Sequence, residues 1–104
     1  MTDIVTDTKE FTVTIIQHAN VIIKNLTTPT SVESGEDFTI TYDATNNGAT
    51  DSCYGRVVDV DSNSEIANSY WTESISTGST KNCSIVIPGK TTQHNLKIEV
   101  GYQK

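Results

Sequence analysis

The stretch from Asp37 to Gly48, which reads DFTITYDATNNG, decides the fold of this chain. Between Phe38 and Thr45 apolar and polar residues alternate strictly. Successive side chains of a β-strand point to opposite faces, so this pattern predicts a strand with one face in a core and the other in water. The stretch ends in Asn46-Asn47-Gly48, residues that adopt positive φ easily and therefore favour a chain reversal.

Similar alternation recurs on both sides of this stretch. Further strands are expected over residues 10–17, 21–26, 53–60, 65–75, 83–87 and 96–100. Turn residues separate the strands at intervals of about 8–12 residues, a spacing typical of a β-sandwich or barrel. We predict an all-β sandwich of about seven antiparallel strands, formed as one domain by residues 10–104 after a flexible segment of residues 1–9. The residues expected in its core are Phe38, Ile40, Tyr42, Ile85, Ile98 and Val100.

Composition argues against several classes of partner. The chain has 104 residues, a formal net charge of −6 and seven basic residues, which are scattered singly. Without a basic patch to neutralise phosphates, nucleic acid is not expected as a partner. No run of about twenty apolar residues occurs, so membrane insertion is not expected. The start, MTDIVTDTKE, does not resemble a secretory signal, so we expect either a chain that stays soluble where it is made or a mature piece with an added Met1.

The turn signals occur in an order that resembles a known family. In chain order they are Ser34-Gly35-Glu36, Asn46-Asn47-Gly48, Thr77-Gly78-Ser79 after Ile75, and Pro88-Gly89, which leads through His94 into LKIEV. From Asn20 to Tyr102 the chain resembles the cell-adhesion-related domain found in bacteria (CARDB), an immunoglobulin-like sandwich. The resemblance implies an immunoglobulin-like or fibronectin-III-like topology and a role as a spacer or adhesive unit on surfaces, and related sandwiches recur in virus particles. It implies no catalytic residues.

The resemblance also implies a further edge strand after the one that ends near Tyr102, whereas this sequence stops at Lys104. A sandwich that lacks an edge strand exposes an apolar groove and unpaired backbone groups. We expect residues 10–17 to serve as the edge strand, either within their own domain or donated to a neighbouring copy by strand addition. The apolar residues that this strand would bury are Phe11, Val13 and Ile15.

The two cysteines, Cys53 and Cys83, each begin a predicted strand. In an immunoglobulin-like topology these strands run in the same direction in opposite sheets, which places both cysteines near one end. A disulfide between them would stabilise the fold by about 3–4 kcal/mol in the chain-entropy model. The alternative is two free buried thiols, since Cys83 is in line with Ile85 and Ile87. Two lone cysteines give no support to a zinc site.

A second candidate site lies across a predicted hairpin, where oxygen-bearing side chains alternate in a D-x-D-x-N-x-E pattern. Its residues are Asp59, Asp61, Asn63 and Glu65. Alternating oxygen ligands suit calcium, but the sixth loop position is Ser64 instead of Gly and the twelfth is Tyr70 instead of Glu. We interpret the pattern as a solvated acidic turn, with calcium as the weaker alternative. No metal or cofactor is expected.

Tyr70 and Trp71 are adjacent, so on a strand only one of them can point inward. An exposed ring at either position could stack on a sugar or pack in an interface. We favour Trp71 in the core and Tyr70 at its rim.

The sequence therefore predicts a non-enzymatic structural or adhesive module on a virion or cell surface. Its expected partners are copies of itself or a surface or capsid scaffold, joined by strand exchange. The alternative is a carbohydrate- or ligand-binding module of an extracellular protein that uses Tyr70 or Trp71. An enzyme is not expected, because the sequence has no nucleophile–base pair, phosphate loop or metal cluster.

Overall fold

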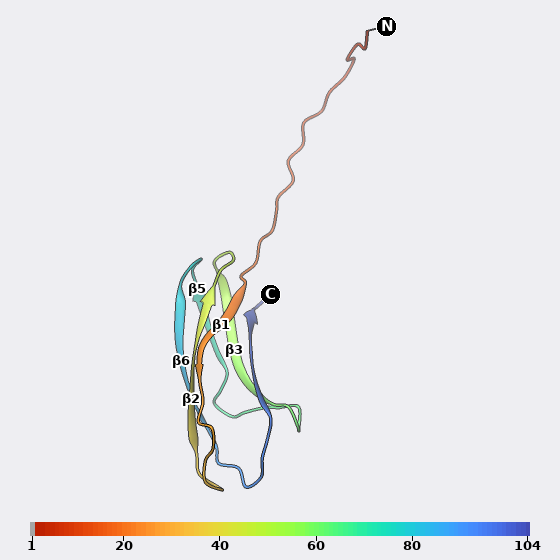
Figure 1. The fold of residues 1–104 in the computed structure, drawn as a ribbon. Helices are drawn as coiled ribbons and strands as arrows, with labels where there is room; N and C mark the ends of the chain where they lie inside the picture. The colour runs from red at the N-terminus through yellow and green to blue at the C-terminus, as the bar shows by residue number, and fades with distance from the viewer. Residues whose placement is uncertain (1) are drawn as a thin grey trace.

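The computed structural model describes residues 2–104, which form seven strands and no helix (Figure 1). The strands are β1 (Val21–Thr27), β2 (Phe38–Asn46), β3 (Asp51–Asp59), β4 (Ser64–Glu65), β5 (Trp71–Ile75), β6 (Thr80–Ile87) and β7 (Leu96–Tyr102). Every pairing between them is antiparallel. The prediction of an all-β sandwich of about seven antiparallel strands is confirmed. Within residues 2–104 no helix is long and apolar enough to cross a membrane.

The strands form two sheets. The first has the order β1-β2-β6, and in the second β3 pairs with β4 and β5 on one side and with β7 on the other. The register of β2 and β6 sets Ile40 opposite Ile85 and Tyr42 opposite Cys83. All four side chains are buried, as the alternation of the two strands predicts. The apolar face of the first sheet thus forms one wall of the core.

The expected strand over residues 65–75 is wrong in its continuity. It is divided into β4 and β5, and the chain turns between them, where Asn68 has a φ of 62°. The Ser69 hydroxyl donates to the carbonyl of Ile66 at 2.6 Å and accepts from the N–H of Val57 at 3.1 Å. These buried side-chain bonds take the place of a strand pairing, so the segment leaves the ladder and returns to it at Trp71.

The N-terminal segment does not pair with its own domain. Residues 2–20 form no strand and lead away from the end of the sandwich where β1 begins (Figure 1). Phe11, Val13 and Ile15 are 85%, 66% and 73% exposed. For this chain, the prediction that residues 10–17 add to the edge of their own sandwich is wrong. Donation to a neighbouring copy stays a prediction, as does the flexibility of residues 1–9.

The residues just before β1 explain this direction. The carbonyl of His18 accepts the N–H of Ala49 at 3.1 Å, and the N–H of Asn20 donates to the Asn46 side chain at 3.1 Å. Ala19 between them is buried. These contacts hold residues 18–20 at the end of the sandwich where β1 begins. The preceding residues 10–17 therefore lie outside the sandwich.

Candidate functional site

The outer edge of β7 carries unpaired backbone groups. Within residues 2–104, β7 pairs with β3 alone. The N–H of Gln103 donates to the Ser52 carbonyl and the N–H of Val60 to the Asn95 carbonyl, both at 2.8 Å. Since bonded and non-bonded pairs alternate in an antiparallel ladder, the odd-numbered residues of β7 bond to β3 and the even-numbered ones direct N–H and C=O outward. The outward residues are Leu96, Ile98, Val100 and Tyr102.

An apolar groove lies beside this edge. It has a volume of about 380 Å³ and runs between β1 and β7, with the beginning of β2 at its floor. The apolar side chains that line it include Ile23, Leu26, Pro29, Phe38, Leu96 and Ile98. Ile23 and Leu26 are exposed, and Phe38, Leu96 and Ile98 are only half-buried, although they pack against the core. Phe38, Ile98 and Val100, expected in the core, pack against it but are only partly buried, because within residues 2–104 no strand pairs with the outer edge of β7.

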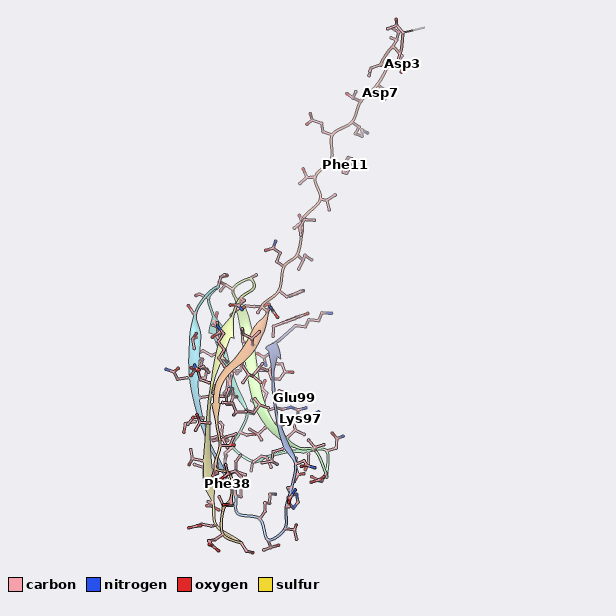
Figure 2. All side chains as sticks on the ribbon, in the orientation of Figure 1. Asp3, Asp7, Phe11, Phe38, Lys97 and Glu99 are labelled. Carbon is pink, nitrogen blue, oxygen red and sulfur yellow. The ribbon has the colours of Figure 1, made fainter. Side chains whose placement is uncertain are left out.

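Charged residues border the groove on the outer face of the second sheet. The Arg56 guanidinium lies 2.8 Å from the Glu99 carboxylate, and Lys97 lies 3.3 Å from the other oxygen of Glu99. The hydrogen bond from Arg56, followed by that from Lys97, holds the pKa of Glu99 below its usual value. Figure 2 shows Lys97 and Glu99 together on β7, and Phe11 far from them on the N-terminal segment. The edge therefore combines an apolar inner face with a charge-paired outer face.

Together, the free backbone groups and the groove define what this site can do. Unpaired N–H and C=O groups of an edge strand are a template for a further strand, and the groove can take alternate side chains of that strand. The site therefore suits an extended polypeptide with apolar residues at every second position.

A polar cluster surrounds Asp59 at the end of the sandwich where β3 ends and β7 begins. Asp59 itself is buried. Its Oδ1 accepts the backbone N–H groups of Asp61 and Ser62 at 3.0 and 3.4 Å. Its Oδ2 lies 2.8 Å from Nδ1 of His94 and 3.8 Å from the Lys90 ammonium. Burial by itself would raise the pKa of Asp59, but the backbone bonds and His94 outweigh it and hold this pKa below its usual value.

Of the four candidate calcium ligands, only Asp59 and Asp61 belong to one cluster, and its third member is His94. Asp59 and Asp61 approach His94, with ligand atoms within 4.8 Å of one another, whereas Glu65 lies 3.4 Å from Arg56. Asn63 adopts a φ of 53° in the exposed turn. The interpretation as a solvated turn holds for the exposed residues but is wrong for Asp59, whose carboxylate bonds the turn backbone from inside.

The lowered pKa of Asp59 predicts how the stability of the fold depends on acid pH. Its folded-state pKa is depressed, so its contribution is present above the unfolded pKa of about 4 and is lost as pH falls through the folded value. We expect Asp59→Asn to lower the melting temperature at pH 7 and to flatten its decline below about pH 4. Melting curves between neutral and strongly acid pH test this, with Asp7→Asn in the exposed N-terminal segment as the control. An unchanged acid limb in Asp59→Asn would contradict it.

The cysteines are free, so the disulfide alternative is wrong for this structure. Cys53 packs with Ala19 and Ile75, whereas Cys83 belongs to the main core cluster with Tyr42. The two thiols therefore occupy separate parts of the interior. Burial raises the pKa of both thiols, which keeps them protonated and weakly nucleophilic at neutral pH.

Trp71 turns inward and Tyr70 outward. Trp71 packs against the core, and its Nε1 donates to the Tyr42 hydroxyl at 2.8 Å. Burial raises the pKa of Tyr42 to about 12. A Cβ on Gly55 would lie 2.5 Å from Trp71 Nε1, so the glycine leaves room for the ring. Trp71 is partly buried, and the Lys81 ammonium lies 5.3 Å from the centroid of its ring, so this ring is less accessible than that of Tyr70.

Tyr70 is 46% exposed, so it lies at the surface. It stacks on Tyr54, with ring centroids 6.1 Å apart, and its hydroxyl accepts from Gln103 Nε2 at 2.7 Å. Of the two candidate binding residues Tyr70 is the more exposed, and it already contacts Tyr54 and Gln103.

Two residues, Asn46 and His18, make structural contacts that the sequence did not indicate. Asn46, expected only as a turn residue, is fully buried, and its amide bonds the carbonyls of Ala49 and Ile75 at 2.8 and 2.9 Å. His18 stacks on Tyr102 with ring centroids 4.4 Å apart. The Asn46–Ile75 bond and the His18–Tyr102 stack join residues far apart in the chain, so no local pattern signals them.

Comparison of the chain with protein-family models, with curated proteins and with solved structures finds no match in any of the three. The resemblance to the CARDB family therefore stays a prediction.

Proposed function

We propose that this protein is a non-enzymatic structural module of immunoglobulin-like type that assembles with copies of itself through the outer edge of β7. The observation that carries the proposal is the pairing of free backbone groups on β7 with an uncovered apolar groove beside them. Half-buried apolar side chains in a sandwich core lose water contact when a further strand covers them, which favours association. Its placement on a virion or cell surface follows from the resemblance.

A carbohydrate-binding role receives less support. Sugar-binding surfaces rely on exposed aromatic rings, and of the two residues considered only Tyr70 is exposed. The β7 edge instead offers main-chain hydrogen bonds and an apolar groove, which favour a polypeptide partner.

The assembly is tested with the full chain and a single proline. The N–H of Val100 points outward from β7, so Val100→Pro removes a donor from the free edge without breaking a bond to β3. We expect the unaltered chain to form oligomers that grow with concentration, and Val100→Pro to have the mass of one chain, 11.3 kDa. Sedimentation velocity measures both.

Val100→Ala is the matched control, because it shortens the same side chain and keeps the N–H. It is expected to assemble. Circular dichroism establishes that both variants keep their strands. If the unaltered chain stays a monomer at high concentration, or if a folded Val100→Pro assembles like Val100→Ala, the proposal is wrong.

A further inference from the structure

We infer that the strand added to β7 is residues 10–17 of a second copy, antiparallel to β7, with Phe11, Val13 and Ile15 opposite Val100, Ile98 and Leu96. This inference rests on the proposed assembly and specifies its occupant, direction and register. It makes the polymer a head-to-tail chain in which each copy donates one strand and accepts one.

The segment has the pattern that the groove requires. Phe11, Val13 and Ile15 alternate with Thr12 and Thr14, and all three apolar side chains are in water in the single chain. β7 has seven residues, close to the length of the segment. An exposed alternating strand and an uncovered groove thus occur in one molecule, and joining them between copies removes both sets of apolar side chains from water.

The segment cannot reach its own groove in this direction. His18 stacks on Tyr102, so the end of β7 and the root of the segment lie at the same end of the sandwich. A strand antiparallel to β7 would have to finish beside Leu96, at the opposite end of a seven-residue strand, about 20 Å away. The segment would therefore have to unfold the docked residues 18–20 to occupy its own domain.

In a second copy the same direction is favourable. The donated strand enters at the Tyr102 end of the acceptor and leaves beside Leu96 and Leu26, at the other end of the sandwich. It then continues into the β1 strand of its own domain, since Figure 1 shows the N-terminal segment leading straight into the start of β1, at the end of the sandwich where the C-terminus also lies. Residues 16–18 span about 10 Å, so successive domains abut along one axis.

The register follows from side chains on both faces. Placing Ile15 opposite Leu96 sets Thr14 beside Lys97 and Thr12 beside Glu99 on the outer face. A shift of two residues toward the start of β7 sets Glu10 opposite Glu99, and like charges in that position are destabilising. A shift the other way sets Gln17 against Leu96 and leaves no residue to link the domains. The chosen register satisfies both limits.

The occupant is tested by two substitutions of equal charge in the full chain. Val13→Asp places a carboxylate in the apolar groove, so we expect it to abolish assembly and leave a folded monomer. Thr14→Asp places the same charge on the outer face beside Lys97, so we expect it to assemble like the unaltered chain. Both residues lie outside the folded sandwich in the monomer, so neither change should alter its melting curve.

The register is tested by oxidation of paired cysteines. Thr14 and Lys97 are directly opposed at a non-bonded position, where Cβ atoms approach closely enough for a disulfide. We expect Thr14→Cys with Lys97→Cys to give a ladder of covalent oligomers after diamide treatment. Thr12→Cys with Lys97→Cys is diagonal to it and is expected to remain mostly unlinked. The chain with only Cys53 and Cys83 gives the background, since both thiols are buried.

Different results would contradict the inferred strand and the proposed assembly. If Val13→Asp assembles normally, or if the diagonal pair links better than the opposed pair, the inferred strand or register is wrong while the β7 assembly stands. If the unaltered chain never assembles, the proposed function itself fails, and this inference fails with it.

Discussion

Ile85→Ala is expected to lower the free energy of unfolding by about 2–5 kcal/mol, through lost transfer energy and a residual cavity. Ile85 is 8% exposed and lies opposite Ile40 in the β2–β6 pair, inside the main core cluster. A domain of this size is stable by only about 5–15 kcal/mol, so the loss is a large share of the total. Urea unfolding followed by the fluorescence of Trp71 measures it.

The neighbouring residue supplies the control. Val86 is 58% exposed on the opposite face of the same strand, so Val86→Ala should change the stability by no more than about 0.5 kcal/mol. Equal losses in the two variants would mean that the faces of β6 are not distinguished as the structure places them.

Sequence reasoning succeeded where a local period decides the outcome. In β2 and β6, alternation alone identifies which side chains face the core, and Ile40, Tyr42 and Ile85 are all buried there. The chain reversal near Asn46-Asn47-Gly48 is also found, but Asn46 is the last residue of β2 and none of the three residues has a positive φ, so the expected backbone conformation of this turn is wrong.

It failed where contacts are long-range. The Asp59–His94 bond spans 35 residues, and Asp59 lies in a stretch whose alternating oxygens suggested a solvated turn. Likewise the alternation of residues 10–17 predicts a strand, but these residues form none in the single chain, and the pattern cannot say which edge such a strand would meet. The anchoring of His18 and Asn20 decides that, and it depends on Ala49 and Asn46 far along the chain.

The exposure of the half-buried residues also depends on long-range structure. Phe38 and Ile98 follow the alternation of core residues, but their exposure depends on whether another strand covers them. A periodic pattern identifies the inward face of a strand, whereas coverage is a property of the assembled sheets.

Gly48→Ala is expected to cost about 1–3 kcal/mol, because a side chain there meets backbone that must move. A Cβ on Gly48 would lie 2.6 Å from both the Asn20 nitrogen and the His18 oxygen. Those two atoms bond Asn46 and Ala49 and hold the start of β1 in the sandwich. We therefore expect urea unfolding to show lower stability, and limited proteolysis to cut around residues 18–20 faster.

Asn47→Ala is the matched control, since Asn47 is exposed and uses only its backbone N–H, to the Asn20 carbonyl at 2.9 Å. Alanine keeps that bond, so stability and cleavage should stay near those of the unaltered chain.

In the proposed polymer, residues 18–20 also direct the donated strand away from its own groove. Gly48→Ala should therefore form shorter oligomers than Asn47→Ala at equal concentration, since a loosened root lets the strand sample directions that do not reach a second copy. If Gly48→Ala matches Asn47→Ala in stability, cleavage and oligomer length, then residues 18–20 are not held as the contacts with Gly48 require.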